Sequence, residues 1–299
     1  DLCTQRFQRQ TIRRGRYGSA EPPQRLLQRN RHRILMREQV RAMRRKLLML
    51  SATILVIGLA ATTVLAVKPE GNRATRENGR VIYERSCLFC HGAEGKGDGP
   101  AGWFIGRYEA PRPRDFTSEG FKLRSTESGS LPTDQDLFRT VTRGIPGYMP
   151  SFAGLTETER WQVIAYVKSF NPAFQTETPV PLLLGGPAPL ASPTSIETGR
   201  ALYVRFECHT CHGSDGRGDG PVSEAGDLKD ASGLRIFATD LTRPLSFKNG
   251  SSPQDLVRTL MTGLDGTPMP SYAVQLTGKE DEAWYLAQYL LSLSSGPFP

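Results

Sequence analysis

Two stretches of this sequence repeat each other and decide its fold. Residues 77–100 read ENGRVIYERSCLFCHGAEGKGDGP, and residues 197–221 read ETGRALYVRFECHTCHGSDGRGDGP. Farther along the chain, GYMPSF at 147–152 corresponds to TPMPSY at 267–272. Two copies of one pattern in a chain of 299 residues predict two domains of the same fold, each with a site of its own.

The quoted part of each copy contains a Cys-x-x-Cys-His motif. Its residues are Cys87, Cys90 and His91 in the first copy, and Cys208, Cys211 and His212 in the second. This spacing is the attachment signature of c-type haem: two thiols add to the vinyl groups of one haem, and the adjacent histidine ligates the iron. A zinc site uses the same residue types, and a thioredoxin-like pair has the same cysteine spacing, but that pair needs a βαβ context. The motifs therefore predict two covalently bound haem c groups. A zinc site and a thioredoxin-like cysteine pair are the less favoured alternatives.

The second axial ligand of each iron follows from counting side chains. Only four histidines occur in the chain; His32 lies in the N-terminal arm, and His209 lies inside the second attachment loop. Met149 and Met269 each lie in a Met-Pro-Ser-aromatic loop, 58 and 57 residues after the attachment histidines. Methionine more often fills a core, as we expect for Met261 in a predicted short helix. The matched spacing favours the first two as iron ligands, which leaves one-electron transfer and no catalytic residue.

Helices make up the predicted secondary structure, so the fold class is all-α. Helices are expected at about 74–88 and 195–209, from the N-caps Thr133 and Ser252 to about 143 and 262, and from the capping boxes Thr156-x-x-Glu159 and Thr277-x-x-Glu280 to about 170 and 293. The stretches between them are rich in Gly and Pro and have little strand character.

Composition divides the chain into five predicted segments. They are a basic arm at 1–46, a transmembrane helix at 47–67, a first domain at 70–172, a proline-rich linker at 173–194 and a second domain at 195–299. The formal net charge of +8 comes from the arm, which has 14 Lys/Arg against 3 Asp/Glu. The rest of the chain has slightly more acidic than basic groups, so the high isoelectric point describes the arm alone.

The predicted membrane helix has 21 residues without a charge, enough to span a bilayer. Basic residues precede it, so the positive-inside rule puts the N-terminus in the cytoplasm and everything after residue 68 outside. A cleaved signal peptide is the alternative, but the long arm and the long apolar stretch argue against it. An arm tied to a membrane favours anionic lipid over nucleic acid as its neighbour, and Cys3 receives no role.

On these motifs the chain resembles a membrane-anchored dihaem class I cytochrome c with two tandem domains, over about residues 72–170 and 195–299. The resemblance implies that a glycine and an aromatic residue of the first helix pack on an aromatic residue of the last: Gly79, Tyr83 and Tyr166 in one domain, and Gly199, Tyr203 and Tyr289 in the other. It also implies that the carbonyls of Pro100 and Pro221 accept the ring N–H groups of the attachment histidines. Arg112, Arg114 and Arg243 are candidates for the haem propionates, with solvated surface as the alternative, and Trp103, Trp161 and Trp284 are expected in the cores.

Cytochromes of this kind occur as electron-transfer subunits of quinol-oxidising, oxidase and photosynthetic complexes. The resemblance therefore implies an integral membrane redox complex as partner (cytochrome b, oxidase or reaction-centre subunits), together with other cytochromes, at the periplasmic side of a bacterial inner membrane. It implies no enzyme activity for this chain alone. The alternatives are a stand-alone membrane-anchored shuttle and a dihaem peroxidase or thiosulfate-oxidising enzyme, although a methionine is offered to each iron and no cysteine outside the two motifs follows the membrane segment.

Overall fold

The computed structural model describes residues 36, 38–39, 41–46, 68–69, 71–105, 111–118, 120–184 and 187–294. The chain divides into two units, residues 1–65 and 66–299. The predicted membrane helix at 47–67, Cys3 and most of the basic arm lie outside the described residues. Among the residues that are described, no helix has the length and apolar character needed to cross a membrane.

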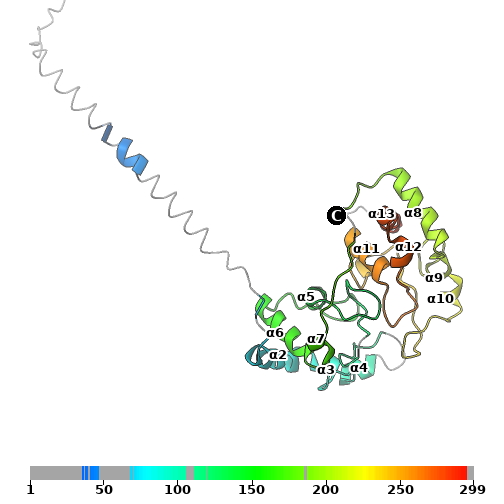
Figure 1. The fold of residues 1–299 in the computed structure, drawn as a ribbon, viewed down its shortest axis with the longest axis horizontal. Helices are drawn as coiled ribbons and strands as arrows, with labels where there is room; N and C mark the ends of the chain where they lie inside the picture. The colour runs from blue at the N-terminus through cyan, green and yellow to red at the C-terminus, as the bar shows by residue number, and fades with distance from the viewer. Residues whose placement is uncertain are drawn as a thin grey trace, which may run out of the picture. The chain divides into compact units, whose positions relative to one another are not determined.

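The second unit is built from short helices joined by irregular loops (Figure 1). We call residues 71–176 the first half and residues 193–294 the second half. The first half contains α2 (Arg73–Ser86), α3 (Leu88–His91), α4 (Pro100–Ile105), α5 (Asp134–Arg143), α6 (Glu157–Lys168) and α7 (Ala173–Thr176). The second half contains α8 (Pro193–Arg205), α9 (His209–His212), α10 (Pro221–Glu224), the 3-10 turn η1 (Pro244–Ser246), α11 (Pro253–Thr262), α12 (Ala273–Leu276) and α13 (Glu280–Ser292). Over the described ranges only isolated β-bridges occur and no strand forms, so the all-α prediction is confirmed there.

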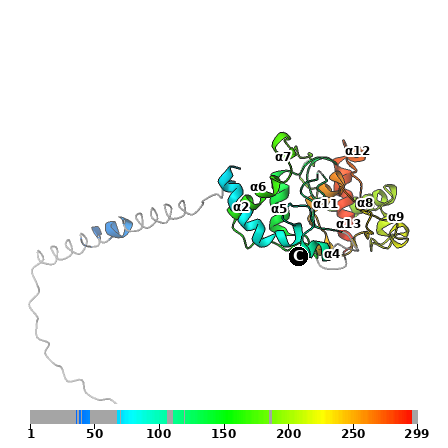
Figure 2. The same ribbon diagram turned by 90° about the horizontal axis from the view of Figure 1, so that it is seen from below.

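One helix pair organises each half: α2 packs on α6, and α8 packs on α13 (Figures 1 and 2). Both crossings are tight because a glycine lies at the contact. A Cβ atom on Gly79 would lie 2.0 Å from the Gln162 carbonyl oxygen, and one on Gly199 would lie 2.1 Å from that of Tyr285. Beside each glycine two tyrosine rings meet, with centroids 5.2 Å apart for Tyr83 and Tyr166 and 5.4 Å apart for Tyr203 and Tyr289. The expected packing of a glycine and two aromatic residues is thus present in both halves.

Three of the four predicted N-cap residues start a helix where the sequence predicts one. Thr133, Thr156 and Ser252 each accept the backbone N–H three residues on, within a complete capping box. The predicted box at Thr277 is wrong. Thr277 is the C-cap of α12, its hydroxyl donates to the carbonyl of Ala273 in that helix, and α13 starts only at Glu280. Gly278, with φ of +75°, separates the two helices and gives the chain a left-handed turn that a continuous helix cannot include.

The cores are apolar and mostly helical. Trp161 and Trp284 are buried in the first and second half, and Met261 is buried in α11, all as expected. The predicted linker contacts both halves: the Leu182 N–H donates to Ser125 O at 2.8 Å, and the Gln288 amide donates to Pro189 O at 2.9 Å. The stretch between the halves is therefore hydrogen-bonded at two points along its length.

Candidate functional site

The first Cys-x-x-Cys-His motif forms a single helical turn directly after α2. Cys87 ends α2, and its carbonyl accepts the His91 N–H at 2.9 Å, which closes the turn. Gly92 then ends α3 with φ of +78°, and the buried hydroxyl of Tyr83 donates to its carbonyl at 2.7 Å. The first helix thus fixes where the motif begins, and Tyr83 fixes where it ends.

The second motif repeats the bonds that close and end this turn, although α8 ends at Phe206 and Glu207 separates it from the motif. The His212 N–H donates to Cys208 O at 2.9 Å, and Gly213 ends α9 with φ of +80°. Tyr203 donates to Gly213 O at 2.6 Å. The two motifs therefore present their side chains in the same way.

None of the four motif cysteines forms a disulfide, and all four are of intermediate burial. Burial raises the pKa of Cys87 to about 11 and that of Cys208 to about 11, so both are neutral thiols at pH 7. Redox-active cysteines are instead thiolates, stabilised by nearby positive charge. No three His, Cys, Asp or Glu side chains converge into a metal-holding group within the described part of the chain. The site therefore fits thioether attachment better than the zinc or redox-pair alternatives.

Each attachment histidine is oriented by a backbone carbonyl, but not by the predicted one. His91 Nδ1 lies 3.1 Å from Arg114 O, and His212 Nδ1 lies 2.9 Å from Thr239 O. The prediction that Pro100 and Pro221 supply these carbonyls is wrong, because both prolines begin short helices instead. A carbonyl can only accept, so Nδ1 carries the proton and Nε2 is left as a free lone pair. Burial also lowers the pKa of both imidazoles, and only a neutral imidazole binds metal.

A second repeated pattern, Asp-x-Thr at 115–117 and 240–242, follows these carbonyls in the sequence. Asp115 in the first half and Asp240 in the second accept both the N–H and the hydroxyl of the threonine two residues on. The intervening residues, Phe116 and Leu241, donate their N–H groups to Gly95 O and Gly216 O. These bonds tie the loop to the glycine-rich segment after each motif, and the residue before the aspartate then faces the imidazole.

The predicted methionine ligands lie at equivalent points, on the loops after α5 and α11. Met149 O accepts the Ile145 N–H at 2.8 Å, and Met269 O accepts the Leu264 N–H at 3.1 Å. Two residues after each methionine a serine hydroxyl donates back to the preceding helix, to Thr142 O or to Met261 O. Each methionine is thus held in a small closed loop.

In the second half, Tyr272 links the methionine loop to the attachment turn. Its ring lies 5.2 Å from that of Phe206, and its hydroxyl lies close to the Cys208 thiol. In the first half, Cys87 packs in the same apolar cluster as Val141 and Leu155, which flank the Met149 loop. The attachment turn and the methionine loop are therefore in contact in the second half, and in the first half they pack against the same apolar cluster.

Cationic side chains cluster beside the first site. Lys122 is half-buried, and burial together with the nearby charges of Lys248 and Arg114 lowers its pKa to about 8. Among the described residues, neither Lys122 nor Lys248 has a hydrogen bond or an ion pair. Arg114 is also half-buried, whereas Arg243 is exposed beside Asp240. Of the predicted propionate-binding arginines, Arg114 thus has the burial that such a role requires, and Arg243 does not.

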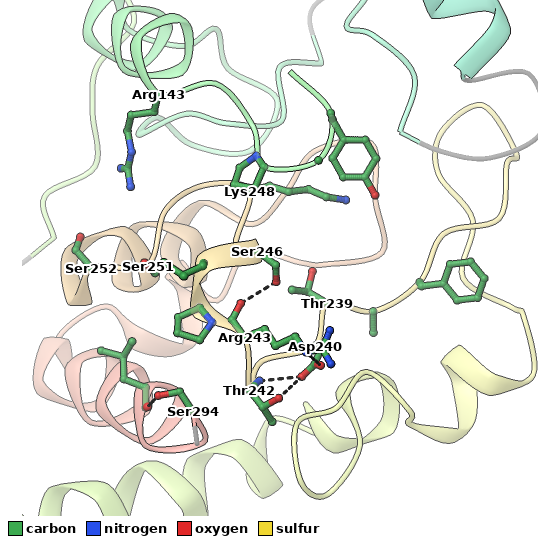
Figure 3. A pocket seen from close by; sticks show the side chains of 18 residues that line it. Arg143, Thr239, Asp240, Thr242, Arg243, Ser246, Lys248, Ser251, Ser252 and Ser294 are labelled. Carbon is green, nitrogen blue, oxygen red and sulfur yellow. Dashed lines mark hydrogen bonds and ion pairs between the residues drawn. The ribbon is translucent and has the colours of Figure 1, made fainter. Parts of the chain in front are cut away.

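An open cavity of about 1290 Å³ lies along the loop that follows Thr239 (Figure 3). The second half contributes Thr239, Arg243 and Lys248 to its lining, and the first half contributes Arg143 and Tyr148. Lys248 Nζ lies 4.5 Å from the centre of the Tyr148 ring. Tyr148, which precedes the candidate ligand Met149, therefore lines the same cavity as Thr239, whose carbonyl orients His212 of the second half.

The family comparison matches both halves. The family described as cytochrome c oxidase, cbb3-type, subunit III matches residues 74–167 and 194–290. A solved chain of the Kuenenia stuttgartiensis reducing HAO-like protein complex Kustc0457/Kustc0458 is 40% identical, with a TM-score of 0.66, over 73% of this chain and 96% of that one. No curated protein matches the sequence. Because the matched ranges make up more than half of the chain, it belongs to the cbb3-type subunit III family of c-type cytochromes.

Proposed function

We propose that this chain binds two haem c groups, one in each half, and transfers single electrons as a subunit of a larger redox complex. The thioether positions are Cys87 and Cys90 in the first half, and Cys208 and Cys211 in the second; the axial ligands are His91 with Met149, and His212 with Met269. The helix at 47–67 anchors the chain in a bacterial inner membrane, with both haem-binding halves on the periplasmic side.

The matched orientation of the two histidines carries this proposal. In both halves a buried imidazole donates from Nδ1 to a backbone carbonyl, on a turn that also presents two cysteine side chains. Such a bond fixes the tautomer and the ring plane and makes Nε2 a better metal ligand. Finding the same constellation twice, on a repeated sequence, supports one haem in each half.

The residues of the chain have separate tasks in this mechanism. When bound, haem supplies an iron that gains and loses one electron, with a potential raised by thioether ligation. The cysteines would hold the haem covalently, and each histidine–methionine pair would supply both protein ligands of the iron, which would leave no position for a substrate. Arg114, Lys122 and Lys248 are half-buried cations close to one another, and they suit the haem propionates. Their charge also favours the reduced form over the oxidised form, which carries one more positive charge.

A partner complex is supported by both comparisons. The matching family is described as an oxidase subunit, and the similar solved chain comes from a protein complex. A chain with filled axial positions only receives and passes on electrons, so another protein must supply them and a third must accept them. We propose an integral membrane redox complex with cytochrome b, oxidase or reaction-centre subunits, and with other cytochromes.

The test has two steps. The purified chain should contain two covalent haems, and the double variant Cys208→Ala/Cys211→Ala should contain one. Gentle solubilisation of native membranes, followed by mass spectrometry of the haem-staining band, should then recover subunits of a redox complex. A wild-type chain with fewer than two covalent haems refutes the site assignment. A band that migrates alone in several detergents refutes the complex and favours a membrane-anchored shuttle.

A further inference from the structure

Arg124 is a fully buried arginine in the loop between α4 and α5. Its side chain is 0% exposed, which is rare for a residue that is almost always charged. Within its own loop, Nε donates to Glu127 O at 2.9 Å and Nη1 donates to Phe121 O at 3.1 Å. These two bonds fix the guanidinium plane, so its remaining donors point in a defined direction.

The outer nitrogen of this guanidinium reaches the second half. Arg124 Nη2 donates to Thr262 O at 2.7 Å and to Asp265 Oδ1 at 2.8 Å. The Asp265 carboxylate also accepts the Ser128 hydroxyl at 2.7 Å and the Gly129 N–H at 2.8 Å. A carboxylate of the second half is thus held by three groups of the first half, and its side chain is only 13% exposed. Charge-assisted bonds of this kind are strong and directional where water is excluded.

Asp265 lies inside the loop that carries Met269. The loop is closed by the bond from Leu264 N–H to Met269 O at 3.1 Å. It is braced by Thr267, whose hydroxyl donates to Leu264 O at 2.7 Å and lies 3.2 Å from the Met269 nitrogen. Only a few backbone bonds separate the clamped carboxylate from the candidate ligand, so a displacement of Asp265 displaces Met269.

The first half has no equivalent restraint. Its loop runs from Gly144 to Met149, is one residue shorter than the loop from Gly263 to Met269, and contains no acidic residue. The second half contacts it through Lys248, which lies over the half-exposed ring of Tyr148. The clamp therefore acts on one methionine loop and leaves the other as an internal reference.

We propose that Arg124 is a positioning residue for the iron site of the other half, and that its clamp on Asp265 and Thr262 keeps the Met269 thioether on the iron. The proposal rests on the proposed function, in which Met269 is the sixth ligand. Arg124, a residue of the first half, thus determines whether the iron of the second half keeps its methionine ligand. When the clamp is lost, we expect the second iron to lose its methionine and the first to keep it.

The test uses the full-length chain with both haems attached. Ferric haem with a methionine ligand has a weak long-wavelength charge-transfer band, and each site contributes to it. The variants Met149→Leu and Met269→Leu should each remove about half of the band, because one of two equivalent ligands is lost. Arg124→Gln should also remove about half, and a redox titration should show one midpoint potential lowered and the other unchanged.

Combined variants identify the site that is affected. Arg124→Gln with Met149→Leu should abolish the band, whereas Arg124→Gln with Met269→Leu should lose no more than Met269→Leu alone. Arg139→Gln is the matched control, because it removes another hydrogen bond between the halves, the 3.1 Å contact of Arg139 Nη2 with Asn249 Oδ1, from within α5 and outside both methionine loops; it should keep the full band.

Three results separate the outcomes. If neither methionine variant reduces the band, the proposed ligands are wrong. If the methionine variants behave as expected but Arg124→Gln keeps the full band, the clamp proposal alone is overturned. If Arg124→Gln does not accumulate, Asp265→Ala, which removes the oxygen atoms that accept from Arg124, Ser128 and Gly129, decides by the same criterion: a full band overturns the proposal, and a half-lost band supports it.

Discussion

Replacing Gly79 with alanine tests the closest helix contact in the first half. The new Cβ would lie 2.0 Å from Gln162 O and 2.6 Å from Gln162 C. Both atoms belong to the backbone of α6, so no side-chain rotation relieves the clash and the two helices must move apart. Overpacking of this kind costs up to about 3 kcal/mol. Alanine in a helix interior regains about 1 kcal/mol relative to glycine, so we expect a net loss of about 2 kcal/mol in the free energy of unfolding.

Urea unfolding of the haem-loaded chain, followed by far-ultraviolet circular dichroism, measures this loss. A loss of this size lowers the unfolding midpoint by about 1–2 M urea for a domain of this length. Gly199→Ala should do the same to the second half, where the Cβ would lie 2.1 Å from Tyr285 O. Gly154→Ala is the control, because its Cβ has no atom within 4 Å. A midpoint and slope for Gly79→Ala that equal those of the wild type would refute the packing argument.

Three further outcomes are expected. The double variant Cys87→Ala/Cys90→Ala should carry one covalent haem instead of two, as measured by haem content per chain. Thr156→Ala should cost about 1 kcal/mol of stability through the lost capping box, whereas Thr277→Ala should change stability by less than about 0.5 kcal/mol, because Thr277 caps no helix N-terminus; urea midpoints compare the two. The bonds from the Thr156 N–H and hydroxyl lower the pKa of Glu159 below 4.5. The effect of Thr156→Ala should therefore be full above pH 4.5 and shrink as the pH falls through the lowered pKa, and an effect that grows on acidification would contradict this assignment.

Local patterns in the sequence were enough to predict much of each half. A capping residue acts over three positions, so Thr133 and Thr156 could be identified from the sequence alone. The pair Gly79 and Tyr83 was implied instead by the resemblance to class I cytochromes c, and both lie at the predicted helix contact. Thr277 shows the limit of such patterns. It has a glutamate three residues on, but Gly278 allows the chain to turn between them, and the same letters then end one helix instead of starting another.

Features that depend on the path of a loop could not be predicted in this way. The carbonyls of Arg114 and Thr239, 23 and 27 positions after the attachment histidines, reach them only because the chain folds back on the glycine-rich segment. The burial of Arg124 is harder still, because its partner Asp265 lies 141 residues away and neither residue belongs to a repeated pattern. The domain boundaries and the methionine ligands stay predictions.

The hydrogen bonds along the segment between the halves have a consequence for kinetics. Leu182 is tied to Ser125, and Pro189 is tied to Gln288, so the segment does not behave as a free tether. Domains on a free tether meet by diffusion, and their encounters slow as the solvent thickens. Electron exchange between the two halves should instead proceed at the same rate in buffer and in concentrated glycerol, because no movement of one half relative to the other has to precede electron transfer.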